Sequence, residues 1–269
     1  MNQSEKRLFL IQSLLAERPS CRKQEIPADS GRQEILLRGL MNVRAPMPIG
    51  TDFLTVQDEY LQAETARKGI TDASNLSPIQ PGLYLWQGDI TTLKCDAIVN
   101  AANSGMTGCY CPNHRCIDNA IHTFAGVELR LACAELMEKQ GHPEPTGQAK
   151  ITPAFNLPCR YVLHTVGPII GGRVSRHDRE LLASCYRSCL ELAAENHLES
   201  VAFCCISTGE FHFPNELAAE IAVRTVREFL QKQTSVKKVI FNVFKDQDKS
   251  IYEKLLRADG TAEGGPAGL

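Results

Sequence analysis

The sequence predicts a layered α/β domain that follows an all-helical extension. From Leu83 onward, short apolar runs alternate with segments of helical periodicity, which is the pattern of strands interleaved with helices. Before that point, apolar residues recur only at helical spacing. About 43% of the 269 residues are hydrophobic and 22% are charged, as in ordinary folded proteins. The length therefore suits one large domain with an extension.

The extension is expected to contain three helices, near residues 4–17, 32–41 and 52–67. Lys6 and Arg7 precede an apolar run, as in a signal peptide, but polar residues interrupt that run within a few positions. An amphipathic helix is therefore the better interpretation. None of the residue types here suggests chemistry, so the extension is expected to be a structural cap.

Charge and cysteine content restrict the class of protein. The net charge of −2 argues against a broad basic surface for nucleic acid or an anionic membrane. None of the apolar runs approaches the roughly 18 residues of a membrane span. The 11 cysteines, an odd number, favour a reducing compartment over a disulfide framework. We expect a cytoplasmic protein that binds neither nucleic acid nor membrane.

Six strands and four helices are expected in the α/β part. The expected strands are Leu83–Gln87, Ala97–Ala101, Ala149–Pro153, Tyr161–Val166, Val201–Ile206 and Val239–Phe244. The expected helices lie near residues 117–140, 176–196, 214–232 and 247–257. Residues 260–269 are rich in Gly and Ala and show no periodicity, which predicts a flexible tail.

A dense group of potential metal ligands lies between a predicted strand and a predicted helix. Cys109, Cys111, His114 and Cys116 fall within one short loop, and zinc prefers thiolate and imidazole ligands. Structural zinc sites usually have four protein ligands, so three ligands with an open position indicate catalysis. The spacing leaves open whether the third ligand is Cys109 or Cys111. The alternative interpretation is a loop of free thiols.

Asp118 follows this loop in the first turn of the predicted helix. The helix dipole favours a carboxylate there, which is an adequate structural explanation. Its position two residues after a possible metal ligand provides the functional alternative. His122 lies on the same side of the helix, and we expect it to be a hydrogen-bonded structural residue.

Two segments that follow strands have the composition of ligand-binding loops. Residues 99–105 combine small residues with two asparagines, whose amides can donate and accept hydrogen bonds. Residues 207–213 join a strand to a helix, where exposed backbone N–H groups form an anion site suited to diphosphate. The phosphate-binding patterns of common ATPases and of Rossmann domains are both missing from the sequence.

Together these segments resemble the macrodomain family, whose members bind ADP-ribose. The resemblance covers roughly residues 82–257. It rests on Gly88-Asp89-Ile90-Thr91, Ala97-Ile98-Val99-Asn100-Ala101-Ala102-Asn103, His164-Thr165-Val166-Gly167-Pro168 and Ser207-Thr208-Gly209. The cysteine-containing loop resembles the zinc-dependent branch, which is found alongside sirtuin-type ADP-ribosyltransferases. The resemblance implies a three-layer α/β/α fold with a mixed, mostly six-stranded sheet in residues 81–259, after a helical extension in residues 1–80.

The resemblance also implies residue roles. It places one zinc ion per chain on Cys109, His114 and Cys116. It makes Asp118 and Asn103 catalytic. The ADP-ribose contacts that it implies are Asp89, Ile90 and Phe244 for adenine, Asn100 and Asn103 for the distal ribose, and Ser207, Thr208, Gly209, Glu210 and Phe211 for the diphosphate. Cys111 and His212 depart from the family pattern, because Cys111 adds a competing thiol and His212 replaces a common glycine.

The implied activity is removal of ADP-ribose from mono-ADP-ribosylated protein side chains, with a sirtuin-type ADP-ribosyltransferase as functional partner. Zinc can lower the pKa of a bound water toward about 7 or polarise a ribose oxygen, and Asp118 could orient or deprotonate the attacking water. Two alternatives stay open. One is a non-catalytic reader of ADP-ribose, and the other is a deacylase of O-acyl-ADP-ribose.

Overall fold

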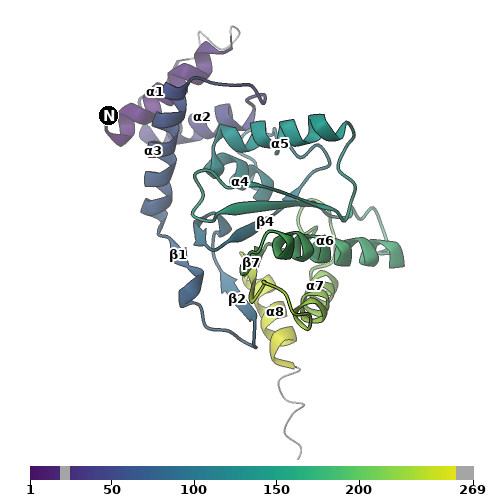
Figure 1. Ribbon diagram of the computed structural model, residues 1–269. Coiled ribbons are helices and arrows are strands. Elements are labelled where there is room, and N and C mark those ends of the chain that lie inside the picture. Colours follow the sequence, from purple (N-terminus) through teal and green to yellow (C-terminus); the bar gives the residue numbers. More distant parts are fainter. Residues whose placement is uncertain (19–24, 259–269) are drawn as a thin grey trace, which may run out of the picture.

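A computed structural model describes residues 1–18 and 25–258 and shows a three-layer α/β/α domain with a helical region at one end (Figure 1). The tail predicted for residues 260–269 lies outside the described residues.

The central sheet has six strands in the order β2-β8-β7-β4-β6-β5. Their bounds are β2 (Leu83–Gln87), β4 (Ala97–Ala102), β5 (Ala149–Pro153), β6 (Tyr161–Val166), β7 (Ser200–Phe203) and β8 (Lys238–Val243). Neighbouring strands are parallel except at β5, which pairs with β6 in antiparallel orientation. The predicted mixed six-stranded sheet is confirmed.

The end of β7 differs from the prediction. The strand expected to run to Ile206 ends at Phe203, because the chain turns there: the Thr208 N–H donates to the Cys205 carbonyl, and Ser207 has a φ of 64°. The short strands β1 (Thr71–Asp72) and β3 (Leu93–Lys94) form a separate parallel pair. The sequence does not predict this pair, because strands of two residues carry no periodic pattern.

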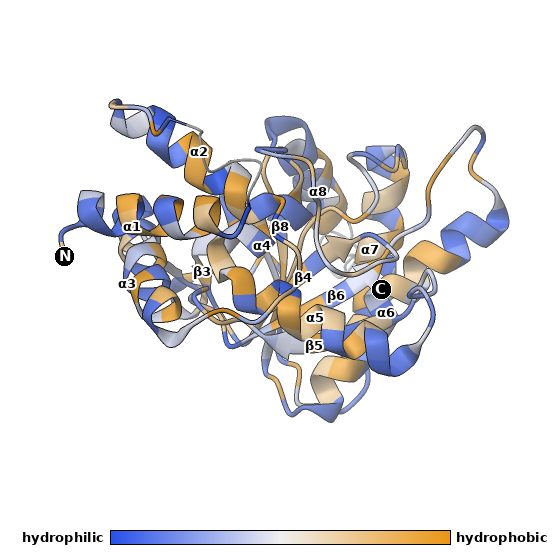
Figure 2. Cartoon of the chain, turned by 90° about the horizontal axis from the view of Figure 1, so that it is seen from above, coloured by the Kyte–Doolittle hydropathy of each residue, from blue (hydrophilic) through white to orange (hydrophobic). Residues whose placement is uncertain are grey.

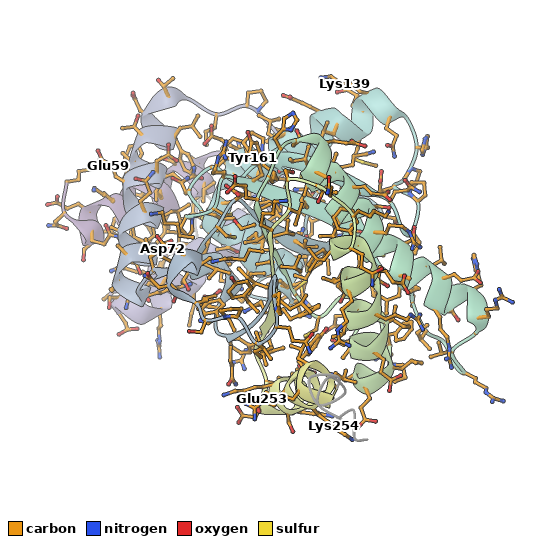
Figure 3. All side chains as sticks on the ribbon, turned by 60° about the horizontal axis from the view of Figure 1, so that its bottom comes forward. Glu59, Asp72, Lys139, Tyr161, Glu253 and Lys254 are labelled. Atoms are coloured by element: carbon orange, nitrogen blue, oxygen red, sulfur yellow. The ribbon has the colours of Figure 1, made fainter. Side chains whose placement is uncertain are left out.

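Helices cover both faces of the sheet. In Figure 1, α4 (Ile117–Ala125) and α5 (Val127–Gln140) lie above it, and α6 (Arg176–Glu195), α7 (Asn215–Leu230) and α8 (Asp246–Ala258) lie below. The core between these layers holds large side chains such as Tyr186 and Phe203, whose ring centroids are 4.9 Å apart. Charged residues such as Glu59, Lys139 and Lys254 lie exposed at the periphery (Figure 3).

The single helix expected over residues 117–140 is wrong, because Gly126 divides it. Gly126 has a φ of 97°, and a Cβ atom there would lie 2.6 Å from the Gln57 amide nitrogen. Gln57 belongs to α3 (Thr51–Lys68), and its Oε1 accepts a hydrogen bond of 2.9 Å from the Val127 N–H. Glycine therefore lets the extension approach and cap the start of α5.

The extension comprises α1 (Gln3–Ala16), α2 (Ser30–Asn42) and α3, which confirms the three predicted helices. These helices gather at one end of the molecule, away from α6 and α7 (Figure 2). Their apolar faces form a second core that includes Leu10, Leu37 and Phe53, and Val127 of α5 joins it. The domain boundary at residues 80 and 81 stays a prediction. Among the helices of residues 1–18 and 25–258, none is long and apolar enough to span a membrane.

Candidate functional site

A cleft of about 1320 Å³ opens at the carboxyl ends of the five parallel strands. This is the edge of an open α/β sheet at which ligands characteristically bind. The strand ends contribute Gly88, Asp89 and Ile90 after β2, Ala101, Ala102 and Asn103 at β4, Gly167 after β6, Cys204, Cys205 and Ser207–Phe211 after β7, and Phe244 after β8. The four segments that suggested a ligand site therefore converge on one cleft.

A group of three potential metal ligands lies in this cleft. The ligand atoms of Cys109, His114 and Cys116 are all within 4.8 Å of one another, and Cys109 Sγ lies 3.6 Å from His114 Nδ1. Cys111 is exposed and outside this group, and its carbonyl accepts a hydrogen bond of 3.0 Å from Asn119 Nδ2. Two thiols and one imidazole fit the ligand chemistry of zinc, and a set of three leaves a coordination position for substrate or solvent.

Asp118 lies beside this group at the start of α4, where Cys116 is the N-cap residue. It is only 5% exposed, yet it lines the cleft. Its Oδ1 accepts a hydrogen bond of 2.8 Å from Asn100 Nδ2, and its Oδ2 accepts one of 3.3 Å from Asn103 Nδ2. Burial raises the pKa of Asp118 to about 6, opposed by these two amides. The carboxyl group therefore has a fixed direction toward the cleft.

The two asparagines of the β4 motif have different positions. Asn103 lines the cleft, whereas Asn100 is 0% exposed and does not line it. The β4–β6 register places Asn100 opposite His164, whose Nδ1 lies 3.2 Å from the Asn100 amide nitrogen. The predicted contact between Asn100 and the distal ribose stays a prediction. Within the described residues, the Asn100 amide supports Asp118, to which it donates a hydrogen bond.

The end of the cleft expected to receive adenine contains Asp89, Ile90 and Phe244. Asp89 caps the short helix η3 (Ile90–Thr92), because its Oδ1 accepts from the Thr91 N–H at 3.0 Å and hydroxyl at 2.6 Å. Its Oδ2 lies 3.1 Å from Lys68 Nζ at the end of α3. Phe244 is 75% exposed at the rim.

Two cleft residues come from the extension, which corrects the expectation of a merely structural cap. Lys68 and Arg38 both line the cleft. The Lys68 ammonium also lies 3.2 Å from the centroid of the Phe124 ring on α4. The sequence does not predict either residue as part of the site, because cations are common on helices and nothing local distinguishes these two from others.

The loop after β7 supplies the remaining predicted contacts, Ser207–Phe211. Ser207 has a positive φ, and Gly167 packs so closely that an added Cβ would lie 2.0 Å from Ser207 Oγ. Glu210 points toward the metal group, with Oε1 3.5 Å from His114 Nε2. His212 is exposed, does not line the cleft and has a φ of 57°, a conformation that favours glycine.

The Macro domain family matches residues 99–222. A "Protein-ADP-ribose hydrolase" of Treponema medium is 58% identical over 260 residues, which are 95% of this chain and 100% of the relative. The chain belongs to the macrodomain family. The family resemblance of the motifs is thereby confirmed.

Another relative and two solved macrodomain structures are also similar to this chain. A Staphylococcus aureus (strain MSSA476) protein of the same name is 53% identical over 226 residues, covering 83% of this chain and 85% of the relative. The Trypanosoma brucei macrodomain in complex with ADP-ribose has a TM-score of 0.63 at 30% identity, over 81% of this chain and 94% of that one. The Oceanobacillus iheyensis macrodomain with ADP has a TM-score of 0.61 at 40% identity, over 68% and 94%.

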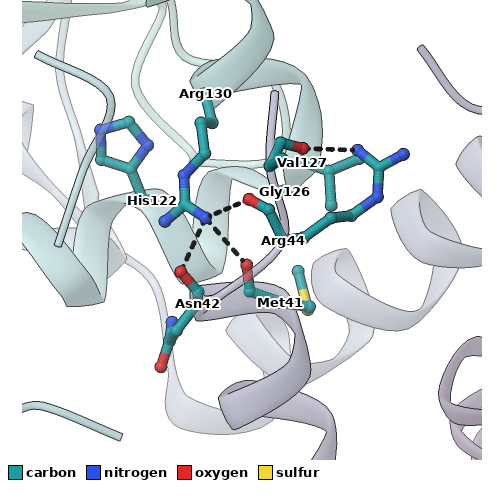
Figure 4. A pocket seen from close by; sticks show the side chains of 8 residues that line it. Met41, Asn42, Arg44, His122, Gly126, Val127 and Arg130 are labelled. Carbon is teal, nitrogen blue, oxygen red and sulfur yellow. Dashed lines mark hydrogen bonds between the residues drawn. The ribbon is translucent and has the colours of Figure 1, made fainter. Parts of the chain in front are cut away.

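The macrodomain also contains a buried group of His122, Cys133 and His164, whose ligand atoms lie within 4.8 Å of one another. The hydroxyl of Thr152 lies 2.9 Å from His164 Nε2 and already engages it. Burial is the main reason that the pKa of His122 is lowered. The Arg130 guanidinium, which lies beside His122 (Figure 4), lowers it further. A neighbouring cation and an engaged ligand nitrogen both disfavour a metal here.

A small cavity beside His122 is lined by residues of α2, α4 and α5 and of the segment that follows α2 (Figure 4). Its volume of about 10 Å³ excludes an organic ligand. Across it, Arg130 Nη1 donates to the carbonyls of Met41, Asn42 and Arg44 at 3.2, 2.7 and 2.6 Å. Within the described residues neither ring nitrogen of His122 has a hydrogen-bond partner, which corrects the expectation of a hydrogen-bonded histidine. Its Nε2 lies 3.6 Å from Asp118 Oδ1.

Proposed function

We propose that this macrodomain is a zinc-dependent hydrolase that removes ADP-ribose from mono-ADP-ribosylated protein side chains. One observation carries the proposal: the carboxyl group of Asp118, aimed by two amides, lies in the cleft beside Cys109, His114 and Cys116. A module that only binds ADP-ribose needs neither feature. The names of the relatives at 58% and 53% identity support hydrolysis.

The cleft can hold ADP-ribose along one line. Asp89, Ile90 and Phe244 would receive the adenine at one end. The backbone of Ser207–Phe211 would receive the diphosphate, because exposed N–H groups at a strand-to-helix turn attract anions. Asn103 would then contact the distal ribose near Asp118. In this order, the bond between the distal ribose and the modified side chain would lie next to Cys109, His114 and Cys116.

Cys109, His114 and Cys116 would hold one zinc ion. Zinc bound there supplies Lewis acidity at the anomeric end of the distal ribose. Asp118 would orient the attacking water and accept its proton, since one of its oxygens is held by Asn100 and the other by Asn103. The bond from the anomeric carbon to the side chain breaks as the bond to the water oxygen forms. A carboxylate side chain would leave as the anion, whereas a serine oxygen would take up the proton that Asp118 has accepted.

The proposal is tested by measuring zinc content and ADP-ribose release on the same preparation. A protein modified by a sirtuin-type ADP-ribosyltransferase is the first substrate to use, because we propose such a transferase as the functional partner. Release with about one zinc per chain supports the hydrolase. Faster turnover of O-acyl-ADP-ribose than of modified protein would favour the deacylase. Binding of ADP-ribose without release from serine-, aspartate- or glutamate-linked substrates would favour the reader.

The choice between the neighbouring thiols gives a first prediction. Cys109→Ser should lose zinc and activity, because Cys109 lies in the ligand group, whereas Cys111→Ser should retain both, because Cys111 is exposed outside it. Metal analysis of the two purified variants under reducing conditions decides between them. The reverse pattern would assign the third ligand to Cys111.

The position of Asp89 gives a second prediction. Asp89→Ala should weaken ADP-ribose binding about 10–150-fold in calorimetry, since a lost hydrogen bond to a charged acceptor costs about 1.5–3 kcal/mol. Asp72 is a matched control, because it caps the short helix η2 (Ala73–Asn75) and lies 3.1 Å from Lys94 Nζ. It repeats the capping and pairing of Asp89 and is not among the cleft residues. Asp72→Ala should leave the affinity unchanged, and an equal loss in both variants would remove Asp89 from the adenine site.

A further inference from the structure

Helix α2 of the extension lies directly against the loop that carries the metal ligands. Arg38 Nη2 donates a hydrogen bond of 3.0 Å to the backbone carbonyl of His114. Four residues later on the helix, Asn42 Oδ1 accepts a hydrogen bond of 2.9 Å from the Asn113 N–H. Between them, Gly39 leaves so little room that an added Cβ would lie 3.1 Å from Asn113 Nδ2. Two adjacent turns of α2 therefore hold two successive residues of the loop.

Arg38 reaches the ends of the loop through Asn119, which is fully buried on α4. Arg38 Nη2 and Nε donate to Asn119 Oδ1 at 2.9 and 3.3 Å. Asn119 in turn donates from Nδ2 to the Cys111 carbonyl at 3.0 Å, and from its backbone N–H to Cys116 Sγ at 3.4 Å. One guanidinium thus links the middle of the loop, a ligand residue and the helix that carries Asp118.

Asn42 connects the same elements from the other side. It is only 1% exposed, and its Nδ2 donates to Thr123 Oγ1 of α4 at 2.9 Å. Its partner Asn113 has a φ of 55°, an uncommon conformation for a residue other than glycine. Such a conformation persists only where the surrounding structure holds it. Here the hydrogen bond to Asn42 Oδ1 holds Asn113, the residue immediately before His114.

We infer that α2 is a template for the metal loop, in which Arg38 and Asn42 are positioning residues that hold Cys109, His114 and Cys116 in ligand geometry before a metal binds. The inference rests on the proposed zinc site and gives the helical extension a part in it. Neither residue would touch the metal. Each would act by restricting the loop, so that less conformational entropy is lost when three side chains are brought to one ion.

The test is the zinc affinity of the full chain, measured by competition with a chromophoric chelator. Arg38→Ala and Asn42→Ala should each weaken zinc binding about 10–100-fold, the usual effect of removing a partner that orients metal ligands. Arg32→Ala is the matched control, because Arg32 is exposed near the start of the same helix. It should bind zinc like the wild type. Wild-type affinity in both test variants would overturn the inference and leave the zinc site standing.

Hydrogen exchange of the metal-free protein gives a readout that needs neither zinc nor activity. In Arg38→Ala and Asn42→Ala, amides of residues 109–116 should exchange faster than in the wild type, while those of β4 and β6 should not change. Unchanged exchange in the loop would overturn the inference. Testing two separate contacts guards against a variant that fails to fold. A wild-type protein that binds no zinc would overturn the proposed function, and the inference with it.

Discussion

Asp118→Ala is expected to slow single-turnover release of ADP-ribose about 10²–10⁴-fold, the range for a positioned general base. Zinc content and ADP-ribose affinity should stay near wild-type values, because a group that acts on the attacking water contributes mainly in the transition state. The position of Asp118, between the amides of Asn100 and Asn103, is the basis for this expectation. Affinity, zinc content and release should be measured on one preparation of the variant.

Glu128→Ala is the control for a helix-terminus effect. Glu128 is the acidic residue in the first turn of α5, as Asp118 is in the first turn of α4. Losing a charge at such a position costs only about 0.3–1 kcal/mol of stability and should not change the rate of release. Equal release by Asp118→Ala and the wild type would rule out the proposed role of Asp118.

His114→Ala is expected to empty the metal site and reduce release to background. His114 supplies the only imidazole among the three proposed ligands, and two thiols alone make an incomplete zinc site. Metal analysis and the release assay on the purified variant check both effects. His177→Ala is a suitable control, because His177 is exposed on α6. Unchanged zinc content in His114→Ala would mean that the metal assignment is wrong.

Most of the fold could be predicted from the sequence because its signals are local. The buried strands β4 and β6 are rich in apolar residues over a short length, and the helices of the extension show regular apolar spacing. The break at Gly126 could not be predicted in the same way. An isolated glycine is tolerated inside a helix. The Gln57 amide that caps the start of α5 after the break is distant in sequence from Gly126.

The candidate site likewise contains some residues that the sequence predicts and others that it does not. The cysteine-containing loop and Asp118 are adjacent in sequence, so spacing indicates the candidates. The choice of Cys109 over Cys111 and the role of Asp118 are implied only by the family resemblance. The contributions of Arg38 and Lys68 depend on how the extension packs against the cleft, which periodicity does not reveal. The burial of Asn100 depends on its register opposite His164, and local sequence contains no information about that register.

Release of ADP-ribose from a mono-ADP-ribosylated protein by metal-free and zinc-reconstituted wild-type protein tests the central claim most directly. We expect negligible release without metal and full recovery on addition of about one equivalent of zinc, because the three proposed ligands beside Asp118 would form a single site. Equal release by the two preparations would contradict zinc dependence.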